Sequence, residues 1–125
     1  MAIKYSKQRE EIKHYLSMRK DHPTADQIYA AMREKLPNIS LGTVYRNLTM
    51  LSDNGEILRL RIGSGADHFD YDTSLHYHFV CNKCGAVSDL EMKSIDSVMD
   101  ASSASFHGRV EGYAIYFYGT CEKCL

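Results

Sequence analysis

The segment HYHFVCNKCG, residues 76–85, holds two histidines two positions apart and a Cys-x-x-Cys pair. Side chains two apart on a strand point to the same face, so the imidazoles of His76 and His78 can reach one point. The two residues between Cys81 and Cys84 suit a tight turn that brings both thiolates to one metal ion. This segment therefore predicts two different sites, one with nitrogen ligands and one with sulfur ligands.

A second Cys-x-x-Cys pair lies at residues 121–124, and the two pairs account for all four cysteines. We find no signal peptide, and no apolar run approaches the roughly 20 residues of a membrane span, so a cytoplasmic protein without membrane contact is expected. In a reducing compartment such pairs are more typical of zinc ligands than of disulfides. A redox-active disulfide and uninvolved thiols are the alternatives. The prediction is one tetrahedral structural zinc site (Zn2+) formed by Cys81, Cys84, Cys121 and Cys124.

The charges are distributed unevenly along the chain. Residues 1–62 contain 11 Lys and Arg against 7 Asp and Glu, whereas residues 63–125 contain 4 against 9. A basic half followed by an acidic half rich in His and Cys indicates a nucleic-acid reader joined to a metal-binding unit. Chance asymmetry in a small protein is the alternative.

Three helices and a hairpin are predicted in the first half. Helical patterns cover residues 6–18, 24–36 and 40–53. Strand patterns cover residues 58–62 and 68–71. Thr24 and Gln27 are placed as a capping box, and Ser40 as an N-cap. This order is typical of a winged helix-turn-helix, with residues 40–53 as the recognition helix.

Four polar residues of this first half are expected on exposed faces: Arg46, Asn47, Arg59 and Arg61. We therefore predict that it binds double-stranded DNA, with the recognition helix on bases and the two arginines of the hairpin on phosphates. A three-helix unit that only packs, without DNA, is the alternative.

The second half is predicted to be a small α/β unit. Its expected elements are strands at 76–80, 86–91 and 109–118 and a helix at 94–105. Residues 113–118 (YAIYFY) are more apolar than a free sheet edge should be, so pairing with a second subunit in a homodimer is expected. The predicted fold class is α+β, with a winged-helix DNA-binding domain over residues 1–71 and a dimerisation and metal-binding domain over residues 72–125.

A second metal site has six candidate ligands: His22, His68, Asp70, His76, His78 and Asp89. Imidazole and carboxylate ligands without sulfur suit Fe2+, Mn2+ or Zn2+. A lone histidine is more often an ordinary surface or core residue than a ligand. The neighbouring pair His76 and His78 reverses that expectation.

Four runs resemble signature runs of the ferric uptake regulator family, and the resemblance extends from about residue 6 to residue 124. The runs are His22-Pro23-Thr24-Ala25-Asp26-Gln27-Ile28-Tyr29, Thr43-Val44-Tyr45-Arg46-Asn47-Leu48, His76-Tyr77-His78 and Cys81-x-x-Cys84-Gly85. The resemblance implies a homodimeric winged-helix repressor with a structural zinc and a regulatory metal at the hinge between its halves. Such a dimer docks on a palindromic operator, and Thr43 and Tyr45 join the residues expected to contact DNA.

Within the family, the chain most resembles the peroxide-responsive repressors. By that resemblance the regulatory Fe2+ or Mn2+ is held by His22, Asp70, His76, His78 and Asp89. His22 is expected from the DNA-binding half and the other four ligands from outside it. Iron-sensing relatives usually have Glu where this chain has Asp89, which favours peroxide sensing. The resemblance further implies that peroxide reacting at the iron oxidises His22 or His76, after which metal and DNA are released.

Two departures from the family pattern affect these expectations. Arg46 resembles the iron regulators, whereas some peroxide sensors have Asn at that position. Many members bind a further metal through positions that are Leu75, Tyr77 and Tyr113 here, so that site is expected to be missing.

Three other functions are compatible with parts of this sequence pattern. The nearest is a reversible iron, manganese or zinc uptake regulator of the same fold without peroxide chemistry. A metalloenzyme is not favoured, because no separate general base or nucleophile motif is visible and five protein ligands leave little room for substrate. The third is a zinc-stabilised interaction module that does not bind DNA. We predict a regulator and not an enzyme.

Overall fold

Side-chain caps begin each of the three N-terminal helices. The computed structural model describes residues 6–61, 65–74, 77–93, 96–111, 113 and 115–125 of the 125-residue chain. The helices are α1 (Lys7–Ser17), α2 (Ala25–Lys35) and α3 (Leu41–Asp53). Ser6 and Ser40 accept from backbone N–H groups of the first turns of α1 and α3, and Thr24 forms the predicted capping box with Gln27. Each cap satisfies amides that the helix itself leaves without partners, which confirms the predicted helix starts.

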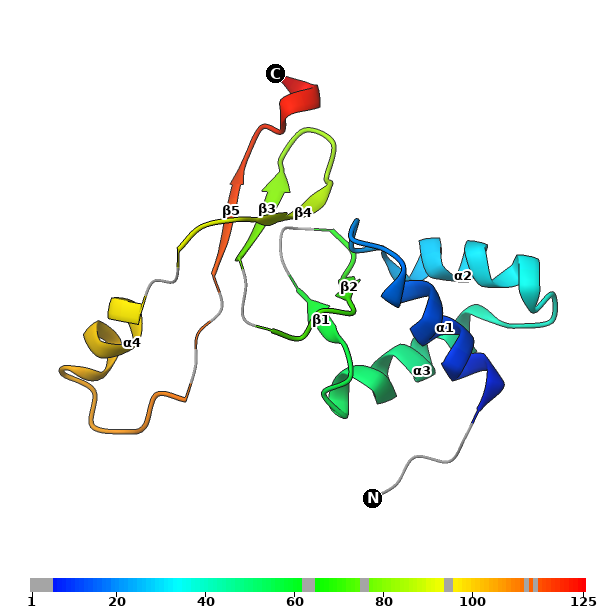
Figure 1. Cartoon of the computed structure of the whole chain (residues 1–125), viewed down its shortest axis with the longest axis horizontal. Coiled ribbons are helices and arrows are strands. Elements are labelled where there is room, and N and C mark those ends of the chain that lie inside the picture. Colours follow the sequence, from blue (N-terminus) through cyan, green and yellow to red (C-terminus); the bar gives the residue numbers. More distant parts are fainter. Residues whose placement is uncertain (1–5, 62–64, 75–76, 94–95, 112, 114) are drawn as a thin grey trace.

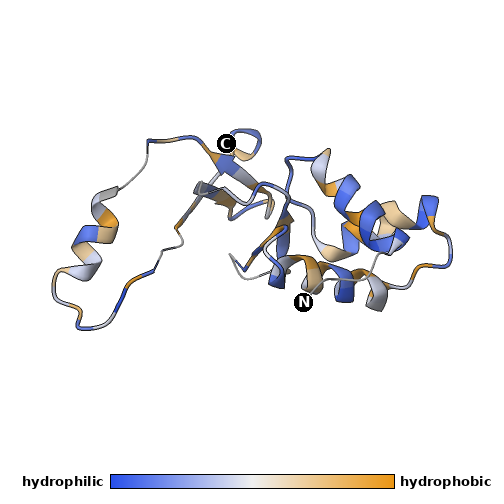
Figure 2. Ribbon diagram, turned by 60° about the horizontal axis from the view of Figure 1, so that its bottom comes forward, coloured by the Kyte–Doolittle hydropathy of each residue, from blue (hydrophilic) through white to orange (hydrophobic). Residues whose placement is uncertain are grey.

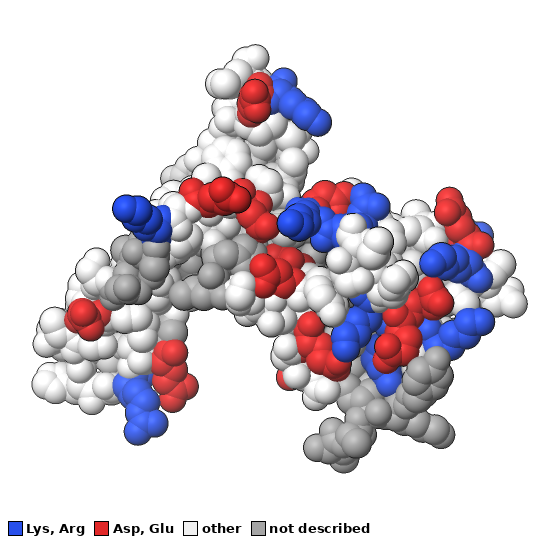
Figure 3. All heavy atoms as spheres, viewed as in Figure 1, with Lys and Arg blue, Asp and Glu red and all other residues white. Residues whose placement is uncertain are grey.

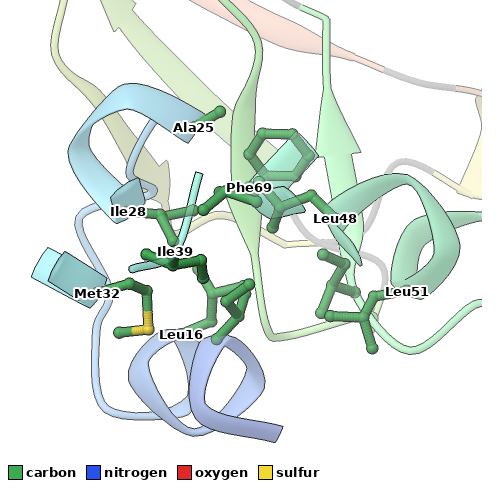
Figure 4. Close-up of a cluster of buried hydrophobic side chains, with 11 residues drawn as sticks. Leu16, Ala25, Ile28, Met32, Ile39, Leu48, Leu51 and Phe69 are labelled. Atoms are coloured by element: carbon green, nitrogen blue, oxygen red, sulfur yellow. The ribbon is translucent and has the colours of Figure 1, made fainter. Parts of the chain in front are cut away.

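The apolar faces of these helices form one core (Figure 4). Its fully or almost fully buried members include Ile12, Leu16, Ile28, Met32, Val44, Leu48, Leu51 and Phe69. Phe69 belongs to the hairpin that follows α3, whereas most other members of the core come from the helices. Its ring anchors the hairpin to the helical unit, so the two form a single body.

The hairpin consists of β1 (Leu58–Leu60) and β2 (His68–Asp70), paired antiparallel with Leu58 opposite Asp70. The chain between α1 and α2 runs beside β2 on its other edge. There the Phe69 amide donates to the Pro23 carbonyl at 2.9 Å, and Thr24 forms an isolated bridge with His68. Three helices followed by this hairpin make the predicted winged helix-turn-helix.

The second sheet contains β3 (Tyr77–Cys81), β4 (Val87–Leu90) and β5 (Tyr116–Gly119) in the order β4-β3-β5. β4 is antiparallel to β3, and β5 is parallel to it. The helix α4 (Asp96–Ser103) stands apart from the sheet, at the opposite end of the molecule from α1 and α2 (Figures 1 and 2). The α+β class and its division into a winged helix and a small sheet unit are confirmed.

The largest differences from the predicted boundaries in this second unit are at the start of the last strand and at the end of α4. The last strand begins at Tyr116 rather than at residue 109, and α4 ends at Ser103 rather than at 105. A strand extends only where a partner strand lies beside it, and the short β3 supplies partners only for residues 116–119. The predicted strand was therefore too long.

On one side β5 has no partner strand within the described part of the chain. Its Tyr116, Phe117 and Tyr118 are exposed, Tyr118 by 72%. An unpaired strand edge with aromatic side chains is a ready site for a second subunit, in agreement with the expected dimer. Among the residues that the structure describes, no helix is long and apolar enough to cross a membrane.

Candidate metal centres and DNA-contacting residues

His22 occupies the turn between α1 and α2, with its side chain almost completely buried. Its φ is 51°, the left-handed region that few residues other than glycine adopt without a reason. One ring nitrogen, Nε2, lies 2.7 Å from Asp89 Oδ1, and the other, Nδ1, lies 3.6 Å from Asp70 Oδ2. Both nitrogens of this imidazole therefore face carboxylates.

Asp70 ends β2 and is only 4% exposed. Its Oδ1 accepts a hydrogen bond from the Asp72 amide at 3.0 Å, which fixes the carboxylate plane. The other oxygen, Oδ2, is directed to the histidines and lies 3.4 Å from His78 Nε2. Asp70 belongs to the hairpin of the winged helix, so the expectation that His22 alone comes from the DNA-binding half was wrong. That expectation overlooked that strand β2 packs into the helical core through Phe69.

His78 and Asp89 face each other as cross-strand partners on β3 and β4. His78 Nε2 lies 3.6 Å from Asp89 Oδ1, and the His22 and His78 rings meet edge to face with centroids 5.2 Å apart. One ligand atom from each of His22, Asp70, His78 and Asp89 lies within 4.8 Å of the others. His78 is 6% exposed, whereas the Asp89 side chain is 38% exposed. The cluster is therefore open to water at Asp89.

The donor set of this cluster is two imidazole nitrogens and two carboxylate oxygens, which suits Fe2+, Mn2+ or Zn2+. His76, the fifth expected ligand, lies outside the described residues. The structure thus brings together four of the five predicted side chains, two from each unit. That these residues bind a regulatory metal remains a prediction.

The four cysteines also converge, with one sulfur from each within 4.8 Å of the others. All four are free thiols, and Cys84 Sγ lies 3.8 Å from Cys121 Sγ. The amides of Cys84 and Cys121 donate to Cys81 Sγ at 3.4 Å each, and these bonds lower the pKa of Cys81 to about 6. The hydrogen bond with Cys121 raises the pKa of Cys124 to about 12. A dication would displace the thiol protons and stabilise four clustered thiolates, so the group fits a tetrahedral zinc ion.

Backbone pairing brings the two Cys-x-x-Cys turns together. Cys81 ends β3 opposite Gly119 of β5, and the Asn82 amide donates to the Gly119 carbonyl at 2.7 Å. The first turn is closed by Gly85 at φ 75°. The spacing of 36 residues between the pairs is thus spanned by β4, α4 and β5, which return the chain to its starting point.

A match to the ferric uptake regulator family covers residues 1–118. The chain belongs to this family. Over 123 residues it is 36% identical to the peroxide-responsive repressor PerR of Staphylococcus epidermidis, a match that covers 98% of this chain and 82% of that protein. The peroxide operon regulator of Bacillus subtilis is 35% identical, with 98% of this chain and 85% of that protein covered.

Among solved structures, the Campylobacter jejuni peroxide stress regulator is similar to the chain, with a TM-score of 0.78 and 28% identity over 94% of this chain and 88% of that one. As a member of the ferric uptake regulator family, the chain is a metal-responsive transcription regulator and not an enzyme. Regulators of this family bind DNA operators and act as dimers.

The recognition helix of a family member is the expected base reader, and here it is α3. Tyr45 and Arg46 are exposed, and Arg46 donates to the Thr43 hydroxyl at 3.1 Å. Asn47 is only 7% exposed and donates to the Thr43 carbonyl at 2.9 Å, so its expected exposure was wrong. Its position, three residues after Val44 and four before Leu51, places it on the buried face of the helix. The DNA contacts of these residues remain predictions.

The two arginines of the hairpin differ in environment. Arg59 donates to Asp67 at 2.8 Å, lies 5.7 Å from the centroid of the Phe69 ring and has a side chain only 25% exposed. Arg61 is 73% exposed, with its Nε 3.9 Å from the same Asp67 carboxylate. Both arginines were predicted on exposed faces; Arg61 is exposed, whereas Arg59 is only partly so. In the sequence, no local signal indicated Asp67 as a partner, because the pairing depends on the hairpin register.

On the face of the molecule shown in Figure 3, most Lys and Arg side chains lie over the helical unit, interleaved with Asp and Glu. A hollow of about 650 Å³ lies between the hairpin and β3, with Leu58, Arg61, Tyr77 and His78 among its lining residues. At its edge the hydroxyls of Tyr77 and Tyr113 are 3.5 Å apart. Tyr77 and Tyr113 stand at two of the three positions through which many family members bind a further metal. The third position, Leu75, lies outside the described residues. That this chain lacks the further metal site remains a prediction.

Proposed function

We propose that this chain is a metal-dependent DNA-binding repressor that senses hydrogen peroxide through oxidation of a histidine ligand of its regulatory metal. The convergence of His22, Asp70, His78 and Asp89 carries the proposal, because it supplies an N/O site at the junction of the two units. Aspartate rather than glutamate at position 89, and the similarity to the peroxide-responsive regulators of Staphylococcus epidermidis and Bacillus subtilis, favour peroxide over iron as the signal.

The proposed regulatory ligands are His22, Asp70, His76, His78 and Asp89, with Fe2+ or Mn2+ as the ion. His22 and Asp70 belong to the winged-helix unit, proposed as residues 1–71, and the others to the second unit, proposed as residues 72–125. Side chains that share one ion hold the two units at one angle, since rotation would break a ligand bond. Ligand binding that selects one of two arrangements is coupling between sites, typically about 1–3 kcal/mol.

When bound, Fe2+ would catalyse the reduction of hydrogen peroxide by the histidine ring, which supplies both electrons. In the overall reaction one peroxide oxygen is added at a ring carbon of a ligand histidine, and the other leaves as water. The oxidised ring carries N–H groups where it had a lone pair, so it can no longer serve as a ligand. His22 and His76 are the proposed targets. Their loss releases the constraint on the two units and lowers the affinity for DNA.

The proposed DNA complex is a homodimer in the cytoplasm on a palindromic operator. Two α3 helices would enter successive major grooves, about 34–36 Å apart. Thr43, Tyr45, Arg46 and Asn47 are proposed at the bases and nearby phosphates, with Arg59 and Arg61 at the phosphate backbone. The structural Zn2+ would be held by Cys81, Cys84, Cys121 and Cys124 and would join β3 to β5 throughout the cycle.

Mass spectrometry combined with operator binding tests the peroxide mechanism. Zinc-loaded protein is charged with Fe2+ or with Mn2+ and exposed to a low dose of peroxide. We expect the iron form alone to lose DNA and to gain the mass of one oxygen atom on a peptide that contains His22 or His76, because manganese reduces peroxide poorly. The cysteines should remain reduced and zinc-bound at that dose.

Two results would contradict this proposal. DNA release that follows zinc loss and disulfide formation, with both histidines unmodified, would indicate thiol sensing. DNA binding that follows the concentration of Fe2+, Mn2+ or Zn2+ but ignores peroxide would indicate a reversible metal-uptake regulator.

A further inference from the structure

His68 is not among the four clustered ligand residues, yet it contacts one of them. Its Nδ1 lies 2.6 Å from the carbonyl oxygen of His22. A carbonyl oxygen can only accept a hydrogen bond, so His68 Nδ1 carries the proton and donates it. The contact joins β2 to the turn between α1 and α2, two segments that are distant in sequence.

The hydrogen bond from His68 holds the backbone of His22, which has an unfavourable conformation. His22 has φ 51°, and a non-glycine residue persists in this region only where its surroundings hold it there. The carbonyl of His22 is held by His68, and the next carbonyl, of Pro23, accepts from the Phe69 amide at 2.9 Å. Phe69 is in turn anchored in the helical core. Two consecutive carbonyls of the turn are thereby bound to β2.

This arrangement also sets the distance between two proposed ligands. Asp70 is two residues beyond His68 on the same strand, and its Oδ2 lies 3.6 Å from His22 Nδ1. Binding the His22 backbone to His68 therefore holds the His22 ring beside Asp70. The other pair, His78 and Asp89, is held separately by the register of β3 and β4.

We propose that His68 is a positioning residue that assembles His22 and Asp70 into one half of the regulatory centre before the metal arrives. The proposal rests on the metal site of the proposed function. With His68 in place, the ion joins two preformed pairs of ligands. Without the His68 N–H donor, part of the free energy of metal binding is used to order the turn that carries His22. Loss of groups that orient a ligand typically lowers metal affinity by about 10- to 100-fold.

Three variants separate the hydrogen bond from the bulk of the ring. His68→Leu removes the donor and keeps an apolar side chain of similar size. His68→Asn keeps an N–H at the position of Nδ1, the same number of bonds from Cα. His14→Leu is the control, because His14 is exposed on α1.

Two measurements on the zinc-loaded full chain are decisive. Titration with Mn2+, followed by the electron paramagnetic resonance of the free ion, reports affinity. We expect His68→Leu to bind about 10- to 100-fold more weakly and His68→Asn to recover most of the loss. Amide exchange of Phe69 in protein without Mn2+ reports whether the turn stays bound to β2, because this amide donates to the Pro23 carbonyl; it should be faster in His68→Leu but not in His68→Asn or His14→Leu.

Unchanged Mn2+ affinity in His68→Leu would overturn the proposal, as would an asparagine variant that recovers thermal stability without recovering affinity. Neither measurement uses DNA or peroxide. If the Mn2+ affinities and the amide exchange come out as expected but DNA binding does not respond to peroxide, the proposed peroxide signal is refuted and the role of His68 is not.

Discussion

Asp89 Oδ1 lies 2.7 Å from His22 Nε2, although the two residues are on different units of the molecule. His22 is buried, whereas the Asp89 side chain is 38% exposed at the end of a short strand. The contact joins the turn between α1 and α2 of the winged helix to the edge of the second sheet. A longer side chain at position 89 would therefore change both the proposed metal coordination and the contact between the two units.

Replacement of Asp89 by glutamate tests this position. Asp89→Glu should retain metal-dependent DNA binding, because a carboxylate remains, but the longer side chain should weaken the peroxide response. The measurement is the fraction of operator-bound protein against peroxide dose, with Fe2+ loaded. Ser88→Ala, an exposed change next to it on β4, is the control. A full peroxide response in Asp89→Glu would show that the length of this side chain is not what selects the signal.

Cys121→Ser should release zinc and dissociate the dimer. Structural zinc contributes about 10–16 kcal/mol to the folding of small zinc-finger peptides, so losing one of four ligands is severe. Zinc content by elemental analysis and oligomeric state by analytical ultracentrifugation are the readouts. Glu122→Gln, the exposed neighbour, should change neither. A folded and dimeric Cys121→Ser variant without zinc would disprove the structural role of the metal.

Arg61→Ala should weaken binding to all DNA sequences about equally. Its side chain is 73% exposed, so it is available to a phosphate. Removing one phosphate contact should lower the slope of log K against log salt concentration by about one. Arg59→Ala should destabilise the hairpin in addition, because Arg59 is bound to Asp67 and stacked near Phe69. Equal slopes in wild type and Arg61→Ala would exclude a phosphate contact.

Arg46→Ala should reduce discrimination between operators rather than general affinity. Arg46 is exposed on α3 and bonded to Thr43, which holds the guanidinium near the start of the helix. A good base contact by arginine is worth about 1–3 kcal/mol of discrimination. Competition between operator and unrelated DNA measures it. The same loss of affinity on every sequence would assign Arg46 to the phosphate backbone.

Glu56→Gln should reduce stability at neutral pH but not in acid. Lys13 Nζ lies 2.6 Å from Glu56 Oε1, and this hydrogen bond lowers the pKa of Glu56 from 4.5. A lowered carboxyl pKa stabilises the fold fully above pH 4.5, and the contribution is lost as pH falls through the lower folded value. Both side chains are about one-third exposed, so the effect is about 0.5 kcal/mol.

Urea unfolding of wild type and Glu56→Gln at pH 7 and pH 3 gives the comparison, since any effect of acid on zinc is common to both. Glu34→Gln, exposed on α2, is the control. A difference of the same size at both pH values would mean that the Lys13–Glu56 pair is not its source.

The elements that the sequence predicted well are those with local signals. Ser6, Thr24 and Ser40 determine the helix starts through contacts within three residues, and Gly55 ends α3 with φ 76°. The start of β5 was predicted poorly, because it depends on the length of β3 rather than on the residues of the segment itself.

The candidate metal site divides in the same way. The spacing of the cysteines and the alternation around His78 were readable from sequence. Asn47 was predicted on the exposed face of α3, but it lies on the buried face, next in sequence to the exposed Arg46. The contacts of His68 with His22 and of Arg59 with Asp67 depend on which segments pack together, and no spacing rule indicates them.

The parallel pairing of β3 with β5 has a consequence for synthesis of the chain. His78 pairs with Tyr116, so this sheet stays incomplete until β4, α4 and the segment after them have been made. The core of α1, α2, α3 and Phe69 needs nothing beyond residue 70. Pairings between distant segments form slowly, and domains generally fold from the N-terminus as they are synthesised. The winged-helix unit can therefore be folded on the ribosome while the sheet of β3, β4 and β5 is still unfinished.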